Sequence, residues 1–160
     1  MMPAITLESD SAERTREIGR AIGQALEAGA RIALVGPLGA GKTCFVQGLA
    51  AGLGCPDKVR SPSFALAHEY EGRCRLYHCD WYRLDTDADV ESTGFEDFLR
   101  DDAVVVVEWA DKHARWLAPP RLVIQIECRD GDRRILRLRD DAGGRYAPAL
   151  AAAQTPKRAS

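Results

Sequence analysis

The segment "GPLGAGKT", at residues 36–43, directly follows the apolar run "RIALV" at residues 31–35. A strand, then Gly-x-x-x-x-Gly-Lys-Thr, then a helix is the setting in which this spacing forms a phosphate-binding loop. Glycine permits backbone conformations that side chains would forbid, so the N–H groups of such a loop can converge on phosphate oxygens. The segment therefore predicts a nucleotide-binding α/β fold.

Within the loop, glycines and polar side chains have separate predicted roles. Gly36, Gly39 and Gly41 shape the backbone, Lys42 neutralises the β- and γ-phosphates, and the Thr43 hydroxyl lies in the shell of a Mg²⁺ ion. The alternative is a glycine-rich turn without a ligand. We disfavour it, because a lysine at the start of a helix is unfavourable unless an anion is present. The loop by itself does not distinguish ATPases, GTPases and small-molecule kinases.

The hydrophobic pattern on either side of the loop predicts helices that alternate with strands, followed by a hairpin. Asp10 and Glu13 resemble a capping box at the start of the first helix, and Asp130-Gly131 is typical of a hairpin turn. We expect an α/β, P-loop-type sandwich with a mixed central sheet, flanking helices and a C-terminal hairpin. Strands are expected at residues 4–8, 31–35, 61–72, 73–83, 103–109, 121–128 and 133–140, with two short helices between residues 84 and 102.

The chain of 160 residues has a length that suits one domain. We assign residues 1–140 to a single nucleotide-binding domain. Residues 141–160 are rich in Ala, Gly and Pro and are expected to form a flexible or weakly helical tail.

Charge and cysteine content narrow the class of protein. A formal net charge of −2 argues against a free-standing nucleic-acid binder. The 5 cysteines are odd in number and lack a Cys-x-x-Cys pair, which favours reduced thiols. A zinc site formed by Cys74, His78 and Cys79 is disfavoured, because Cys79 would point to the opposite face of the strand from the other two. Since neither a secretory signal nor an apolar segment of membrane length is visible, we expect a cytoplasmic protein without membrane contact.

Two carboxylates follow apolar strands, at the edge where open α/β sheets bind their ligands. Glu108 comes after four valines and is a candidate Mg²⁺ ligand; the alternative is an exposed residue at a strand end. Asp80 is a candidate for orienting or deprotonating an attacking water, with an ion pair to Arg83 as its alternative. Trp109 should lie near this site or at its mouth.

Two further segments bear on the nucleotide. The loop "SPSF" at residues 61–64 resembles a switch loop that senses the γ-phosphate through Mg²⁺, although it can equally be an ordinary Ser-Pro turn. A guanine-specific protein needs an Asn-Lys-x-Asp type sequence on a later strand. The segment "ADKHA" at residues 110–114 does not supply it, so GTP is disfavoured.

Five motifs, "GPLGAGKT", "SPSF", "YHCDWYRL", "GFEDFL" and "VVVVEW", occur in an order and at spacings that resemble the bacterial TsaE (YjeE) family. The resemblance implies a compact P-loop ATPase that takes part in forming N6-threonylcarbamoyladenosine in tRNA. It implies ATP/ADP and Mg²⁺ as cofactors and a TsaB–TsaD heterodimer as partner. TsaD would transfer the threonylcarbamoyl group, so the tRNA is contacted only indirectly. The ATPase would reset the complex and hydrolyse ATP slowly alone.

Carried over by position, the resemblance assigns roles to individual residues. Asp80 and Glu108 are implied to be functional carboxylates, and Trp109 to lie beside the nucleotide or the partner. The phosphates would be held by Gly39, Ala40, Gly41, Lys42 and Thr43; Mg²⁺ by Thr43 and Glu108, with Ser63 as a further contributor; and the base approached by Asp10, Ser11 and Arg134.

This sequence departs from the usual family pattern at Pro37, Cys44, Ser63 and Cys79. Cys44 stands where a second threonine is common, so a hydroxyl contact to the α-phosphate is lost while the backbone N–H remains. Two other functions stay open. One is a small-molecule kinase, although the acidic stretch at residues 85–102 is a poor lid with Arg100 as its one arginine. The other is a switch that binds nucleotide without hydrolysing it. We expect the isolated chain to be a monomer.

Overall fold

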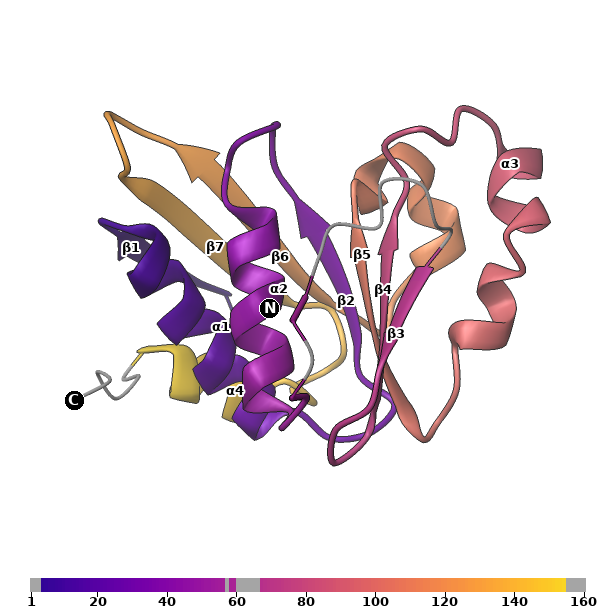
Figure 1. Ribbon diagram of the computed structural model, residues 1–160, viewed down its shortest axis with the longest axis horizontal. Helices are drawn as coiled ribbons and strands as arrows, with labels where there is room; N and C mark the ends of the chain where they lie inside the picture. Colours follow the sequence, from indigo (N-terminus) through magenta and orange to yellow (C-terminus); the bar gives the residue numbers. More distant parts are fainter. Residues whose placement is uncertain (1–3, 57, 60–66, 155–160) are drawn as a thin grey trace.

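The computed structural model describes residues 4–56, 58–59 and 67–154. Within these residues, one sheet has the strand order β1-β7-β6-β2-β5-β4-β3 (Figure 1). β2 pairs in parallel with both β5 and β6, and β4 pairs in parallel with β5, whereas the pairs β1–β7, β6–β7 and β3–β4 are antiparallel. The prediction of a mixed sheet is confirmed. The strands are β1 (Ala4–Ser9), β2 (Arg31–Val35), β3 (Ala67–Tyr70), β4 (Arg75–Asp80), β5 (Ala103–Glu108), β6 (Leu122–Cys128) and β7 (Arg134–Asp140).

Helices cover both faces of this sheet. Ile32 and Leu34 of β2 belong to the core that also contains residues of α1, α2 and α4. Ala33, between them, faces a second core with residues of α3 and of the two 3-10 helices. Because both faces are covered, β5 is buried along its whole length, as its run of valines predicts. The helices are α1 (Ala12–Ala25), α2 (Lys42–Gly52), α3 (Asp87–Ser92), η1 (Phe95–Phe98), η2 (Ala110–Leu117) and α4 (Ala147–Gln154).

Close backbone contact between α1 and α2 fixes the position of α2, the helix that follows the loop. A Cβ at Gly48 would lie 2.1 Å from the carbonyl oxygen of Arg16, and one at Gly52 would lie 2.2 Å from that of Arg20. Contacts this short leave no room for a side chain. The need for glycine at these two positions is not visible in the local sequence, because the groups they contact lie on another helix.

The expected start of α1 needs correction, because the N-cap is Ser11 and not Asp10. The Ser11 hydroxyl accepts a hydrogen bond from the Arg14 N–H at 3.1 Å. A serine hydroxyl is as good a cap as an aspartate, and the strand runs one residue further than predicted, to Ser9. Asp10 is exposed.

The tail is expected to be flexible or weakly helical. In its described residues, 141–154, the helix α4 packs against α1 and buries Ala149, Leu150 and Ala153. The buried Asp140 accepts hydrogen bonds from the N–H groups of Ala142 and Tyr146, at 2.7 and 3.0 Å, which fold the chain back onto the sheet. Residues 155–160 lie outside the described part of the chain.

The structure also bears on membrane contact. In the described ranges, every helix is too short or too polar to cross a bilayer.

Candidate nucleotide-binding site

The glycine-rich loop leaves the carboxyl end of β2, which lies between β5 and β6 in the sheet. Gly39 and Gly41 have positive φ angles of 79° and 96°, a region that residues with a Cβ rarely adopt. Gly36 has a different constraint, since a Cβ there would lie 2.6 Å from the carbonyl oxygen of Ile126. Glycine is therefore required for two reasons: Gly39 and Gly41 adopt positive φ angles, and Gly36 lies too close to β6 to carry a side chain.

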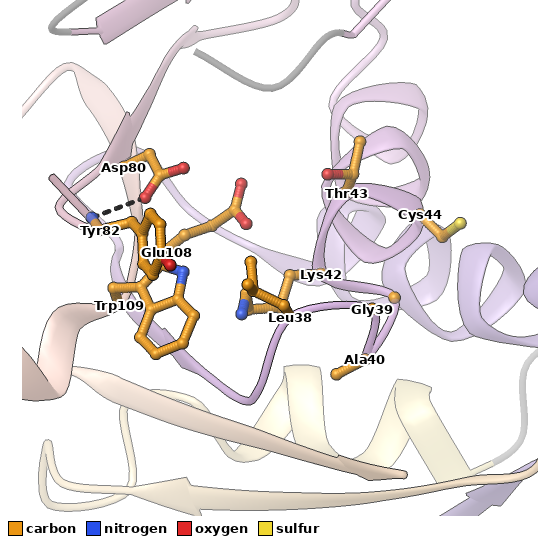
Figure 2. Close-up of a pocket in the computed structure, with 11 residues that line it drawn as sticks. Leu38, Gly39, Ala40, Lys42, Thr43, Cys44, Asp80, Tyr82, Glu108 and Trp109 are labelled. Carbon is orange, nitrogen blue, oxygen red and sulfur yellow. Dashed lines mark hydrogen bonds between the residues drawn. The ribbon is translucent and has the colours of Figure 1, made fainter. Parts of the chain in front are cut away.

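A cavity of about 310 Å³ opens between this loop and the ends of β4 and β5. Figure 2 shows side chains from all three segments directed toward it. The cavity unites most of the residues predicted from separate parts of the sequence. Its lining consists of Leu38, Gly39, Ala40, Gly41, Lys42, Thr43, Cys44, Asp80, Tyr82, Glu108 and Trp109.

Asp80 and Glu108 end two adjacent parallel strands and are partners in the register of β4 and β5. Their carboxylates point toward the space in front of the Thr43 hydroxyl (Figure 2). Asp80 accepts a hydrogen bond from the Tyr82 N–H at 2.9 Å. Partial burial raises the pKa of Asp80; that hydrogen bond opposes the rise, and the neighbouring charge of Glu108 adds to it. Two carboxylates that face one cavity repel each other unless a cation lies between them.

Lys42 lies across the cavity from these carboxylates. Its ammonium group donates to the carbonyl oxygens of Gly36 and Pro37, the latter at 3.1 Å. Desolvation by burial lowers the pKa of Lys42, and the charges of Glu108 and Asp80 oppose this shift. Lys42 therefore stays against the loop backbone, from which it can reach a phosphate placed in the cavity.

Trp109 forms one wall of the cavity, close to where the sequence predicts it. Its φ angle of 59° is unusual for a bulky residue and marks the turn from β5 into η2. The turn places the indole ring 4.1 Å from the Lys42 Nζ and 5.0 Å from the Tyr82 ring, measured to the ring centroid in each case.

His78 was missed as a contributor to this site. Its Nε2 lies 2.5 Å from Oε2 of Glu108, and both side chains are buried. From the sequence, His78 was considered only as a possible zinc ligand. The alternation of β4 does contain a signal, because His78 and Asp80 lie two residues apart and thus on the same face of the strand.

Three residues expected near the base do not line the cavity. Ser11 caps α1, and Asp10 is exposed beside it. Arg134 instead contacts the loop from outside, where its guanidinium donates to the carbonyl oxygens of Gly39 and Ala40 at 3.1 and 3.2 Å. Ser63 and the whole "SPSF" segment lie outside the described residues.

Cys44, the main departure in the loop motif, lines the cavity only with part of its surface. Its side chain points away from Asp80 and Glu108 in Figure 2. The Arg16 guanidinium approaches its sulfur, with 3.7 Å between Nη2 and Sγ. The substitution therefore changes the outer side of the first turn of α2.

The donor set is suitable for a hard cation. Glu108 and Asp80 supply carboxylate oxygens and Thr43 supplies a hydroxyl, which are the ligand types that Mg²⁺ prefers. A phosphate chain on the loop would complete such a shell, since Mg²⁺ is usually bound by one or two protein groups together with substrate phosphates.

A glycine-rich loop between a central parallel strand and a helix, facing acidic strand ends, defines a P-loop-type nucleotide-binding protein. The chain belongs to the TsaE family: the family model described as "Threonylcarbamoyl adenosine biosynthesis protein TsaE" matches residues 9–136. This finding confirms the resemblance drawn from the five sequence motifs and places the chain in the biosynthesis of threonylcarbamoyladenosine in tRNA.

Individual relatives agree with this assignment. The tRNA threonylcarbamoyladenosine biosynthesis protein TsaE of Treponema pallidum is 42% identical over 130 residues, which cover 79% of this chain and 95% of that protein. The protein of the same name from Bacillus subtilis is 36% identical over 135 residues, with 84% of each chain covered. The crystal structure of Bacillus subtilis YdiB matches with a TM-score of 0.80 and 30% identity, over 96% of both chains.

Proposed function

We propose that this chain is a Mg²⁺-dependent ATPase that works with a TsaB–TsaD complex in forming N6-threonylcarbamoyladenosine in tRNA. The observation that carries the proposal is the convergence of Asp80 and Glu108 on Lys42 and Thr43 around one cavity. The family indicates the pathway, and the groups that line the cavity are suited to binding a nucleoside triphosphate.

In this proposal the loop binds the phosphates through its backbone N–H groups. Lys42 turns from the Gly36 and Pro37 carbonyls to the β- and γ-phosphates. Thr43 and Glu108 would hold Mg²⁺, and Ser63 is proposed as a further contributor. When bound, the ion would neutralise charge on the phosphate oxygens.

Asp80 is the group we propose to orient the attacking water. Hydrolysis adds this water to the γ-phosphorus, breaks the bond to the β-phosphate oxygen and yields ADP and phosphate. A carboxylate with a raised pKa accepts a hydrogen bond or a proton from water more readily than an ordinary aspartate. Its hydrogen bond with the Tyr82 N–H keeps the side chain directed at the cavity.

The base is proposed to lie toward the start of α1, near Asp10 and Ser11, on the side of the loop that Arg134 contacts. The start of α1 is close to the loop, because the Thr15 methyl group lies 4.0 Å from where a Gly41 Cβ would be.

The role of partners follows from the charges at the cavity. Among the described lining residues, Lys42 is the one cation. Charge that develops on the γ-phosphate is therefore compensated incompletely, and slow turnover by the isolated chain is expected. We propose that the TsaB–TsaD complex stimulates hydrolysis and alone contacts the tRNA, and that the isolated chain is a monomer. We also propose that the complex works in the cytoplasm, because an odd number of cysteines without a Cys-x-x-Cys pair favours reduced thiols.

The test is the rate of ATP hydrolysis by the chain alone and with a TsaB–TsaD pair, in Mg²⁺ buffer. We expect Asp80→Ala and Glu108→Ala to bind ATP but to lose the stimulated rate. Asp132→Ala, in the exposed turn between β6 and β7, is the matched control and should keep it. Parent-like stimulated rates in both variants would refute the assigned roles. Phosphorylation of a small acceptor in place of phosphate release would indicate a kinase, and binding without any turnover a non-hydrolysing switch.

A further inference from the structure

The buried contact between His78 and Glu108 has a consequence for the ion that Glu108 is proposed to bind. Nε2 of His78 lies 2.5 Å from Oε2 of Glu108, while the same carboxylate group points into the cavity (Figure 2). His78 has no exposed surface, and Glu108 is 4% exposed. The Glu108 carboxylate thus contacts a buried imidazole on one side and the cavity on the other, so the histidine restricts its movement.

We propose that His78 is a positioning residue, whose Nε2–H holds Oε2 of Glu108 so that the other carboxylate oxygen faces the bound divalent cation. The proposal rests on the proposed function, in which Glu108 helps to hold Mg²⁺. It adds a residue that touches neither nucleotide nor metal and acts only through Glu108.

The direction of this hydrogen bond follows from the rest of the ring. In the described part of the chain, Nδ1 of His78 is buried without a hydrogen-bond partner. An ionised carboxylate can only accept, so the proton of the contact belongs to Nε2. A proton on Nδ1 as well would create a buried N–H without an acceptor, which costs more than an unprotonated nitrogen in the same place. The structure therefore assigns Nε2 of His78 as the donor in this contact.

Strand geometry explains why this histidine reaches this glutamate. His78 is the register partner of Val106 on β5, and Asp80 is the register partner of Glu108. The Glu108 side chain meets the histidine two positions before its own register partner. β4 thus contributes Asp80 to the cavity lining at its end, and two residues earlier it contributes His78, which contacts Glu108.

Restraint matters because glutamate has several rotatable bonds. A carboxylate that is already held loses less conformational freedom when it binds an ion. Removing a residue that hydrogen-bonds a metal ligand typically lowers metal affinity by about 10- to 100-fold. Loss of the His78 contact should therefore weaken the contribution of Mg²⁺ to ATP binding, and leave the contribution of the loop unchanged.

The experiment compares ATP binding by calorimetry in Mg²⁺ and in EDTA for the parent, His78→Gln and His78→Leu. A glutamine amide can place an N–H near the position of Nε2, whereas leucine fills the space without a donor. We expect the Mg²⁺-dependent gain in affinity to fall by about 10- to 100-fold in His78→Leu and to be largely kept in His78→Gln. Affinity in EDTA should be the same in all three proteins, and thermal unfolding checks that each is folded.

A residue with only a packing role gives a different pattern. If folded His78→Leu keeps the parental Mg²⁺ gain, or if His78→Gln loses as much as His78→Leu, the proposal is overturned. A parent protein that gains nothing from Mg²⁺ overturns the proposed function itself, and the proposal with it. The two failures are distinguishable, because failure of the proposed function is already seen with the parent protein, before any substitution is made.

A second measurement needs no nucleotide and covers the case in which His78→Leu does not fold. Long-range ¹H–¹⁵N correlation spectra show which ring nitrogen carries the proton, and His78→Gln identifies the signals by their loss. We expect a protonated Nε2 and a bare Nδ1, with the Nε2 signal shifted in Glu108→Ala. A proton on Nδ1 with a bare Nε2, or an Nε2 signal unaffected by Glu108→Ala, overturns the proposal.

Discussion

The ammonium group of Lys42 lies 4.1 Å from the centre of the Trp109 indole ring. Trp109 reaches this position because the chain takes a left-handed turn directly after Glu108. The lysine that is proposed to bind phosphate is thus held by the loop carbonyls on one side and by an aromatic face on the other.

This contact makes Trp109 a reporter of nucleotide binding. When Lys42 moves to the phosphates, the indole loses a neighbouring cation and its fluorescence should change on addition of ATP. Trp109→Phe should abolish that change although Trp81 and Trp116 remain. It should also alter ATP affinity by less than tenfold, because phenylalanine keeps an aromatic ring beside the buried Lys42 and the whole cation–π contact is worth about 0.5–2 kcal/mol. An undiminished ATP-dependent signal in Trp109→Phe would contradict this assignment.

Arg134 is predicted to support the loop through its contacts with the loop carbonyls. Arg134→Ala removes the donors to Gly39 and Ala40 and should weaken the binding of both ATP and ADP. The expected loss is about 1–2 kcal/mol, roughly 5- to 30-fold in Kd, as for a pair of hydrogen bonds with one charged partner. Arg137→Ala, on the same strand but paired with Glu127, is the control and should bind as the parent does. Both dissociation constants are measured by calorimetry, and equal values for the two variants would refute the role.

Gly48 is predicted to be a stability residue. Gly48→Ala places a methyl group against the Arg16 carbonyl and should separate α1 from α2. A cost of about 1–3 kcal/mol in the free energy of unfolding is expected, although alanine is the better helix former. Ala51→Ser, at an exposed position of the same helix, should cost about 0.5 kcal/mol or less. Urea unfolding measures both. A Gly48→Ala variant as stable as the parent would show that the helices do not touch there.

Asp80 should be costly for stability at neutral pH. Partial burial raises its pKa in the folded chain, so the folded state binds the proton more readily than the unfolded state does. Stability from this group is therefore present at low pH and is lost as the pH rises through the folded-state pKa. Asp80→Asn keeps an oxygen acceptor for the Tyr82 N–H and carries no charge. We expect a higher Tm than that of the parent at pH 7, and little difference in acid.

The control for this comparison is Asp132→Asn, at an exposed position in the turn between β6 and β7, which should leave the Tm unchanged at both pH values. A lower Tm for Asp80→Asn at pH 7 would mean that the charge of Asp80 stabilises the chain. In the same variant, partner-stimulated ATP hydrolysis should be lost. Stability and turnover would then change in opposite directions.

Much of the fold could be predicted from local pattern. The strand at residues 31–35, the glycine loop and the hairpin at Asp130-Gly131 were all expected, because apolar periodicity and turn residues are local properties. The cap of α1 was assigned to the wrong neighbour, since Asp10 and Ser11 are both acceptable caps. The packing of α4 could not be predicted, because its small residues give a weak amphipathic signal and are buried through contact with α1.

The sequence by itself determined the phosphate loop, the two acidic strand ends and the family, because each depends on residue types at short spacings along the chain. Only the tertiary structure decided that Asp80 and Glu108 face one cavity, that His78 restrains Glu108, and that Arg134 holds the loop from the far hairpin. The physical reason is strand order: β4 lies beside β5, and β6 runs parallel to β2, which brings the start of β7 to the end of the sheet where the loop lies. Spacing along a chain does not specify which strand ends become neighbours in space.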